Sequence, residues 1–197
     1  MVVVLFACGL AFAETTEPTE PKDNSILIAF FSSAGNIDPN ATIEGGVGQG
    51  NTKAVAEMVH ELIGGELFFI ETVEKYPANY EDTIDVAMQQ QRANARPALA
   101  TQVENVDSYD VIFLGFPNWW GTLPQPVFTF LEEYDFSGKT IIPFCTHEGS
   151  GFGRSIGDLE SLVPDATLLE GFTVRGSSAS NAGDDVAQWI LELKLPE

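Results

Sequence analysis

The chain has 197 residues, of which 44% are hydrophobic, and this length suits one domain with a sizeable core rather than two. It carries 29 acidic against 9 basic residues, a formal net charge of −20 at pH 7. So large an acidic excess opposes binding to nucleic acid and to anionic membrane surfaces.

The N-terminus is typical of an export signal. Residues 2–10 are almost entirely apolar, and Ala11-Phe12-Ala13 has the small-x-small form of a signal-peptidase site, although no positively charged n-region precedes them. Lipid attachment at Cys8 is the alternative, and it would give the chain a membrane anchor. We expect residues 1–13 to be a signal peptide or lipoprotein leader and the protein to be exported, with a cytoplasmic protein as the alternative if the leader is not functional.

Residues 14–24 are rich in Thr, Glu and Pro and are typical of a solvated linker, so the folded domain is expected over residues 25–197. Apolar runs predict five strands, which span Ile26–Phe31, Leu67–Ile70, Val111–Gly115, Thr140–Phe144 and Leu168–Val174. Apolar residues at helical spacing predict five helices, which begin near Thr52, Tyr80, Pro124, Ile156 and Val186. This alternation indicates an α/β fold with a parallel sheet and helices on both faces.

Two details of the helices follow from the same pattern. Thr52 is predicted to cap the first helix, and Gly64-Gly65 to end it. Trp189 shares a helical face with apolar residues and is predicted to lie in the core.

The loop after the first strand is suited to phosphate. Ser32 and Ser33 follow the strand directly, and Asn51 and Thr52 open the next helix after a Gly-rich stretch. Their hydroxyl and amide groups, together with the N–H groups at the helix N-terminus, can all donate to a phosphate. The sequence has neither a Walker-type motif nor a dinucleotide fingerprint here, so a nucleoside triphosphate and a dinucleotide are not favoured.

The loop after the third strand carries two adjacent tryptophans. It reads Pro117-Asn118-Trp119-Trp120-Gly121-Thr122, and it lies at the carboxyl end of a buried strand. Ligands of open α/β sheets bind at that edge, and a flat indole there suggests a flat aromatic ligand. Trp119 or Trp120 is expected to stack on the ligand, and Asn118, Gly121 and Thr122 to bond its ring edge.

The loop after the fourth strand supplies the remaining candidates. Thr146, Gly149 and Gly151 bring backbone close to a ligand, and His147 with Glu148 forms a candidate acid–base pair or proton relay. His147 is therefore the candidate catalytic residue. No metal site is predicted, since no ligand cluster accompanies a histidine. Cys145 is expected to be a buried, inert thiol.

Donors for one phosphate, a flat apolar cover and close backbone together describe an FMN site. These three loops resemble those of the flavodoxin-like superfamily, and the resemblance runs from Ile26 to about Leu195. It implies a three-layer αβα sandwich with a five-stranded parallel sheet of order 2-1-3-4-5, and FMN between the first and third strands. The chain departs from the family's compact phosphate loop by an insertion, Ile37–Gly50, which could be a flap or a partner loop.

Three functions fit these features. The first is an electron carrier that passes electrons from FMN to a redox protein partner. An acidic surround disfavours the anionic hydroquinone and should then lower the second reduction potential of the flavin. The second is an FMN-dependent NAD(P)H:quinone-type oxidoreductase that uses His147 and a small-molecule acceptor. The third is an exported flavin-binding module without turnover.

Overall fold

The computed structural model describes residues 26–32, 50–77 and 79–195. Several predictions lie outside the described residues, namely the leader, the linker, Ser33 and residues 37–49 of the insertion. Among the described residues, no helix is both long and apolar enough to cross a lipid bilayer.

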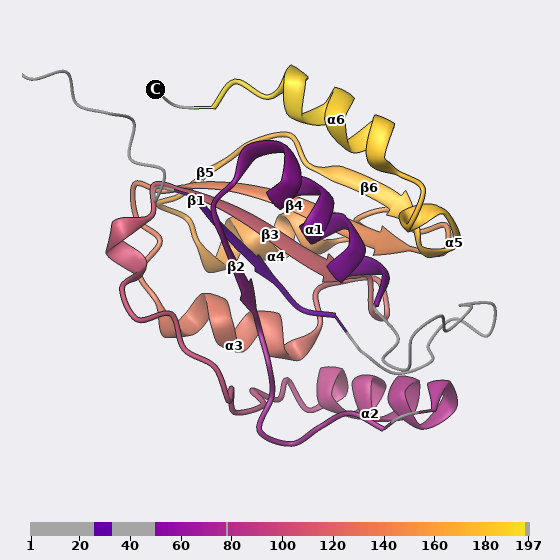
Figure 1. The fold of residues 1–197 in the computed structure, drawn as a ribbon. Helices are drawn as coiled ribbons and strands as arrows, with labels where there is room; N and C mark the ends of the chain where they lie inside the picture. Colours follow the sequence, from indigo (N-terminus) through magenta and orange to yellow (C-terminus); the bar gives the residue numbers. More distant parts are fainter. Residues whose placement is uncertain (1–25, 33–49, 78, 196–197) are drawn as a thin grey trace, which may run out of the picture.

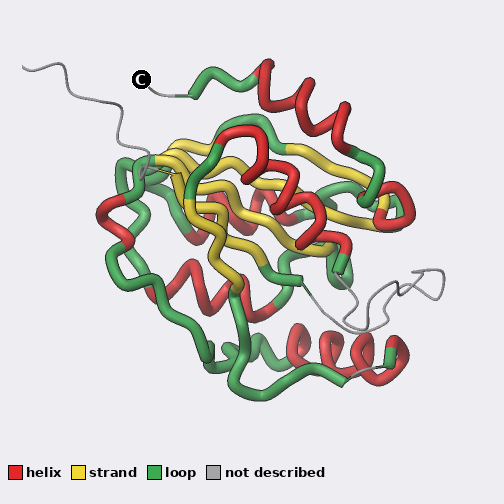
Figure 2. The backbone as a smooth tube through the Cα atoms, viewed as in Figure 1, coloured by secondary structure: helices red, strands yellow, loops and turns green. Residues whose placement is uncertain are grey.

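A parallel sheet forms the middle layer of the molecule (Figures 1 and 2). Its order from one edge is β2 (Glu66–Phe69), β1 (Ile26–Phe30), β3 (Val111–Pro117) and β4 (Thr140–His147), followed by β5 (Thr167–Leu168) and β6 (Phe172–Arg175), which both pair with β4. The predicted order 2-1-3-4-5 is confirmed. Because β1 lies between β2 and β3, the chain changes direction across the sheet at the carboxyl ends of β1 and β3, where open sheets bind ligands.

The predicted continuous strand Leu168–Val174 is wrong, because the outer strand is broken into β5 and β6. Leu168 pairs with Ile141 and Phe172 with Phe144, so the outer strand advances four residues while β4 advances three. Pro143 of β4 lies opposite the break, and proline has no N–H to donate to a neighbouring strand. The extra residue forms a bulge at this point.

Helices cover both faces of the sheet (Figure 1). The helices are α1 (Asn51–Ile63), α2 (Tyr80–Arg92), α3 (Gln125–Glu133), α4 (Ser155–Leu162), α5 (Gly176–Ala179) and α6 (Gly183–Glu192), with a short 3₁₀ helix, η1 (Val106–Ser108), before β3. The five predicted helices are confirmed, and α5 was not predicted. Helices α1 and α6 lie on one face and α3 and α4 on the other, whereas α2 lies beyond the layers, beside α3.

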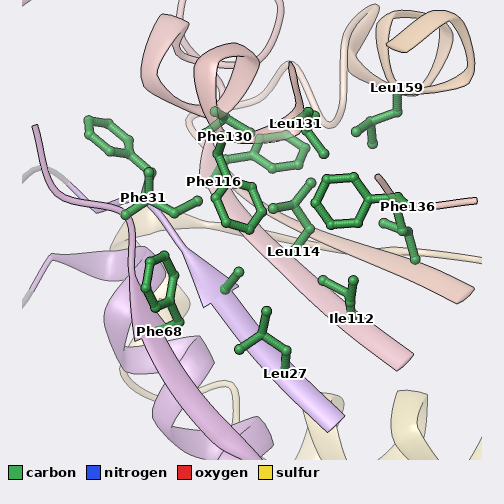
Figure 3. Packing of buried hydrophobic residues seen from close by; sticks show 14 of the residues in the cluster. Leu27, Phe31, Phe68, Ile112, Leu114, Phe116, Phe130, Leu131, Phe136 and Leu159 are labelled. Atoms are coloured by element: carbon green, nitrogen blue, oxygen red, sulfur yellow. The ribbon is translucent and has the colours of Figure 1, made fainter. Parts of the chain in front are cut away.

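The strands alternate their side chains between two cores. In β1, Leu27 and Ala29 face the α3 and α4 side, while Ile28 and Phe30 face α1 and α6. Figure 3 shows the first core, to which Phe130 of α3 and Phe116 of β3 both contribute. Strands buried on both faces need such continuous apolar runs, which explains why the strands could be recognised in the sequence.

Three smaller predictions can be compared with the structure. Trp189 is buried in the second core and Cys145 in the first, as predicted. The prediction that Thr52 caps α1 is wrong. Gly50 occupies the cap position, while Thr52 is a buried helical residue whose hydroxyl pairs with that of Thr146.

Candidate functional site

A cavity of about 700 Å³ lies at the carboxyl edge of the sheet. One wall is α2, which presents Tyr80, Thr83, Ile84 and Ala87. The opposite side is formed by Asn51 of α1, by residues 117–121 at the end of β3, by residues 146–148 and Ser150 at the end of β4, and by Gly176 and Ser177 of α5. Helix α2 lies away from the sheet (Figure 1), and its side chains form this wall of the cavity.

The two tryptophans belong to a tight two-residue turn. Trp119 and Thr122 exchange both backbone hydrogen bonds, at 3.0 and 3.2 Å. Trp120 and Gly121, between them, have φ values of 52° and 85°. Two central residues at positive φ are typical of a type I′ turn, in which glycine is comfortable and a bulky residue such as tryptophan is strained.

Hydrogen bonds from neighbouring loops hold this turn in place. The Asn118 side chain accepts from the Gly121 N–H at 2.9 Å and donates to the Gly151 carbonyl at 2.8 Å. The Arg154 N–H donates to the Gly121 carbonyl at 2.9 Å, and the Thr122 hydroxyl donates to Asp158. The loops after β3 and β4 thus form one bonded unit, which supports the strained conformation of the turn.

The two indoles have different environments. Trp119 is wedged edge-on between Phe31 and Tyr76, with ring centroids 5.2 and 5.0 Å away. Trp120 is 48% exposed, and its indole N–H donates to the Ile84 carbonyl of α2 at 3.1 Å. Trp119 is therefore fixed by the core, whereas Trp120 extends from the turn to the opposite wall of the cavity.

The loop after β4 orients His147. The Gly149 N–H donates to Nδ1 of His147 at 2.8 Å. Burial and the positive charge of Arg175 lower the pKa of His147, and Glu148 opposes them. Glu148 is the one acidic side chain among the described residues that line the cavity, so the acidic surround expected from composition is here a single carboxylate.

The start of α1 reaches the same cavity. A Cβ placed on Gly176 would lie 2.4 Å from the Asn51 amide and 2.6 Å from the Glu148 carboxylate, so these two side chains converge on the glycine and would have to shift to admit a side chain there. The first turn of a helix offers N–H groups that suit an anion. The cavity thus combines a helix end suited to an anion with a flat indole, an arrangement that fits a planar ligand carrying a phosphate, as FMN does.

The structure brings most of the predicted site residues together. Those that line the cavity are Asn51, Pro117, Asn118, Trp119, Trp120, Gly121, Thr146 and His147. Five others lie outside the lining. Ser32 is buried, and the hydroxyls of Thr52 and Thr122 are hydrogen-bonded to Thr146 and Asp158. Gly149 and Gly151 act through their backbone, which bonds the side chains of His147 and Asn118. Ser33 is not among the described residues.

Sequence reasoning missed the α2 wall and the contribution of α5, which follows β6. Tyr80, Ile84 and Ala87 share the helical spacing of a core-facing stripe, so their pattern gave no indication of a cavity. The Gly176-Ser177-Ser178 segment did contain a signal, because small polar residues follow the last strand. Within the part of the chain that the structure describes, no cluster of three His, Cys, Asp or Glu side chains could hold a metal ion.

Comparisons with known proteins agree with this architecture. Residues 45–193 match the family model described as flavodoxin. Among solved structures, a candidate flavoprotein from Bacteroides eggerthii is 28% identical, with a TM-score of 0.68 over 87% of this chain and 99% of that one. A Lactobacillus acidophilus flavoprotein in complex with FMN is 21% identical, with a TM-score of 0.60 over 82% and 99%.

A curated relative, Flavodoxin 1 of Escherichia coli strain K12, is 24% identical over 131 residues. The match covers 64% of this chain and spans 60% of the length of that flavodoxin.

Proposed function

Because the chain belongs to the flavodoxin family, we propose that its cavity binds FMN and that the protein transfers electrons to a redox partner protein. The observation that carries the proposal is the strained Trp119–Thr122 turn at the carboxyl edge of the sheet, beside the N-terminus of α1. When bound, FMN supplies the electron chemistry, and the chain's residues bind, orient and shield it.

The phosphate is assigned to the N-terminus of α1. Asn51 lines the cavity there, and the backbone N–H groups of the first helical turn are suited to an anion. Thr52 contributes backbone only, since its hydroxyl is paired with Thr146 in the interior.

The ring is assigned to the space between the Trp turn and the loop after β4. Trp120 offers a half-exposed indole, and the backbone of residues 146–148 lines the other side. Aromatic pairs of this kind contribute about 0.5–1.5 kcal/mol beyond their area. Asn118 and Thr122 act through the turn, which they hold in place, since the Asn118 amide bonds Gly121 and Gly151.

The exposed aromatic rim supports an electron carrier. Tyr80 and Trp120, which border the cavity from opposite walls, are 45% and 48% exposed, so a partner protein could approach the ligand directly. With a net charge of −20, a partner with a basic surface is favoured, because opposite charges accelerate encounter.

An NAD(P)H:quinone-type oxidoreductase is the second candidate. Helix α2 adds Ile84 and Ala87 as an apolar wall, which a small planar acceptor could use, and His147 lies across the cavity. A carrier does not need such a wall.

An absorbance spectrum of the purified protein tests the proposal first. Flavin bands, present as purified or after addition of FMN, are expected, and a protein that neither contains nor takes up FMN would contradict both functions.

Steady-state oxidation of NAD(P)H with a quinone then separates the electron carrier from the oxidoreductase. Turnover favours the oxidoreductase, whereas FMN binding with reduction only by an added flavoprotein reductase favours the carrier. Binding without either reaction indicates a flavin-binding module.

A further inference from the structure

His147 has one ring nitrogen already engaged by the backbone. Its Nδ1 accepts the Gly149 N–H at 2.8 Å, and an accepting nitrogen carries no proton. In the neutral ring the proton must then reside on Nε2. Gly149 has a φ of 133°, a backbone conformation that residues with a Cβ rarely adopt. Glycine at this position therefore lets the backbone N–H reach the imidazole of His147.

Arg175 is placed to hold the same loop. It is the register partner of His147 across β6 and β4, and its guanidinium donates to the Glu148 carbonyl at 3.1 Å. The guanidinium also lies 3.5 to 3.8 Å from the position that a Cβ on Gly149 would take. A fixed positive charge therefore borders residues 147–149, and it disfavours a second positive charge on the imidazole.

Glu148 does not form an acid–base pair with His147. Its carboxylate lies beside Gly176 and Asn51, and its backbone carbonyl accepts from Arg175. The two charged groups that act on His147 have opposite effects on its pKa: Arg175, together with burial, lowers it, and Glu148 raises it. Burial is the largest of these effects.

We propose that Arg175 is a positioning residue that, with the Gly149 backbone, holds His147 as a neutral imidazole whose Nε2–H donates a hydrogen bond to a carbonyl at the edge of the ligand ring. The inference rests on the proposed function for the identity of that ring. It changes the role expected for His147 from a proton carrier to a fixed donor. A neutral donor orients the ring without adding a charge to it.

Nitrogen-15 NMR of the histidine-labelled full chain tests the proposal, with and without added FMN. The chain has two histidines, so an H60Q variant assigns the signals. At pH 8 the His147 proton is expected on Nε2. A pH titration then compares the wild type with R175Q, R175K and the charge-matched control K194Q. Lys194 lies two residues beyond the end of α6 and is not among the residues that line the cavity.

The pKa of His147 is expected to rise in R175Q, to stay at the wild-type value in K194Q and to be retained in R175K, which keeps the charge. A proton on Nδ1, or a folded R175Q with an unchanged pKa, overturns the proposal. If R175Q fails to fold, the wild-type tautomer and the R175K titration still test the proposal. A pKa of His147 that is raised in R175K, which keeps the positive charge, would also contradict it.

The role toward the ligand has its own readout. Added FMN is expected to shift the Nε2 signal of His147, as a new hydrogen bond would, and an unchanged signal in protein that binds FMN overturns that role. Failure to bind FMN would contradict the proposed function. It would not affect the tautomer of His147 or the effect of Arg175 on its pKa, because both are measured in the protein without FMN.

Discussion

The hydroxyls of Thr52 and Thr146 lie 2.8 Å apart in the interior, although 94 residues separate them in the chain. Thr52 belongs to the first turn of α1, and Thr146 lies near the end of β4. Both elements reach the cavity through the neighbouring residues Asn51 and His147. This pair therefore fixes the distance between the predicted phosphate end and the loop after β4.

Removing one hydroxyl of this pair is predicted to destabilise the fold. T52V or T146V leaves the other hydroxyl buried without its partner, at a cost of about 1–3 kcal/mol. The T52V/T146V double variant should lose less than the sum of the single losses, because no hydroxyl is then left without a partner. Denaturant unfolding of the four proteins measures this coupling, and strictly additive losses would show that the pair does not interact.

Trp119 and Trp120 are predicted to respond differently to substitution. W119A removes a ring packed between Phe31 and Tyr76, so it should lower the free energy of unfolding by about 2 kcal/mol. W120A removes a half-exposed ring and should instead weaken FMN binding about fivefold to tenfold. Thermal unfolding and fluorescence titration with FMN measure the two effects. Equal effects of both variants on stability would contradict the distinct environments.

The positive φ of Trp120 predicts an unusual order of stabilities. W120G and W120A both lack the indole, but alanine keeps the strain of a side chain at a φ of 52°, which glycine relieves. W120G is therefore expected to be more stable than W120A by about 1 kcal/mol. At an ordinary position the order is reversed, so a more stable W120A would show that the turn is not strained.

Glu148 is predicted to lower the reduction potential of the bound flavin. As the one carboxylate in the described lining of the cavity, it disfavours added negative charge. E148Q should therefore raise the midpoint potential by about 20 mV, which corresponds to about 1 kcal/mol for a two-electron couple. Potentiometry of the FMN-loaded protein measures this, with E192Q at the end of α6 as the charge-matched control. A similar rise in E192Q would attribute the effect to overall charge.

The lowered pKa of His147 predicts a pH dependence of stability. Between the ordinary value of 6.5 and the lowered native value, the unfolded chain binds more protons than the folded one. The contribution of His147 to the free energy of unfolding is thus complete above pH 6.5, and it is lost as the pH falls toward the native pKa. H147Q should flatten the free energy of unfolding in that window, whereas H60Q should keep the slope due to His147. A slope that survives in H147Q would assign it to other groups.

The fold was predictable from local patterns to a large extent. Strands buried on both faces require apolar runs, and helices that pack on them require apolar stripes, so both elements are visible in the sequence. The break between β5 and β6 was not visible within the outer strand, since its cause, Pro143, lies in the neighbouring strand. The capping role expected of Thr52 failed for a similar reason: its hydroxyl found a partner 94 residues away.

The candidate site divides in the same way. The sequence by itself determined the three loops, because residues after parallel strands must meet at one edge of the sheet, and it singled out Trp119 and Trp120 there. Only the tertiary structure decided that α2 forms the facing wall, that Trp119 is fixed by the core while Trp120 reaches Ile84, and that Arg175 borders His147. These are contacts between individual side chains of segments far apart in the chain. The alternation of strands and helices brings such segments to one edge of the sheet but does not specify which of their side chains touch.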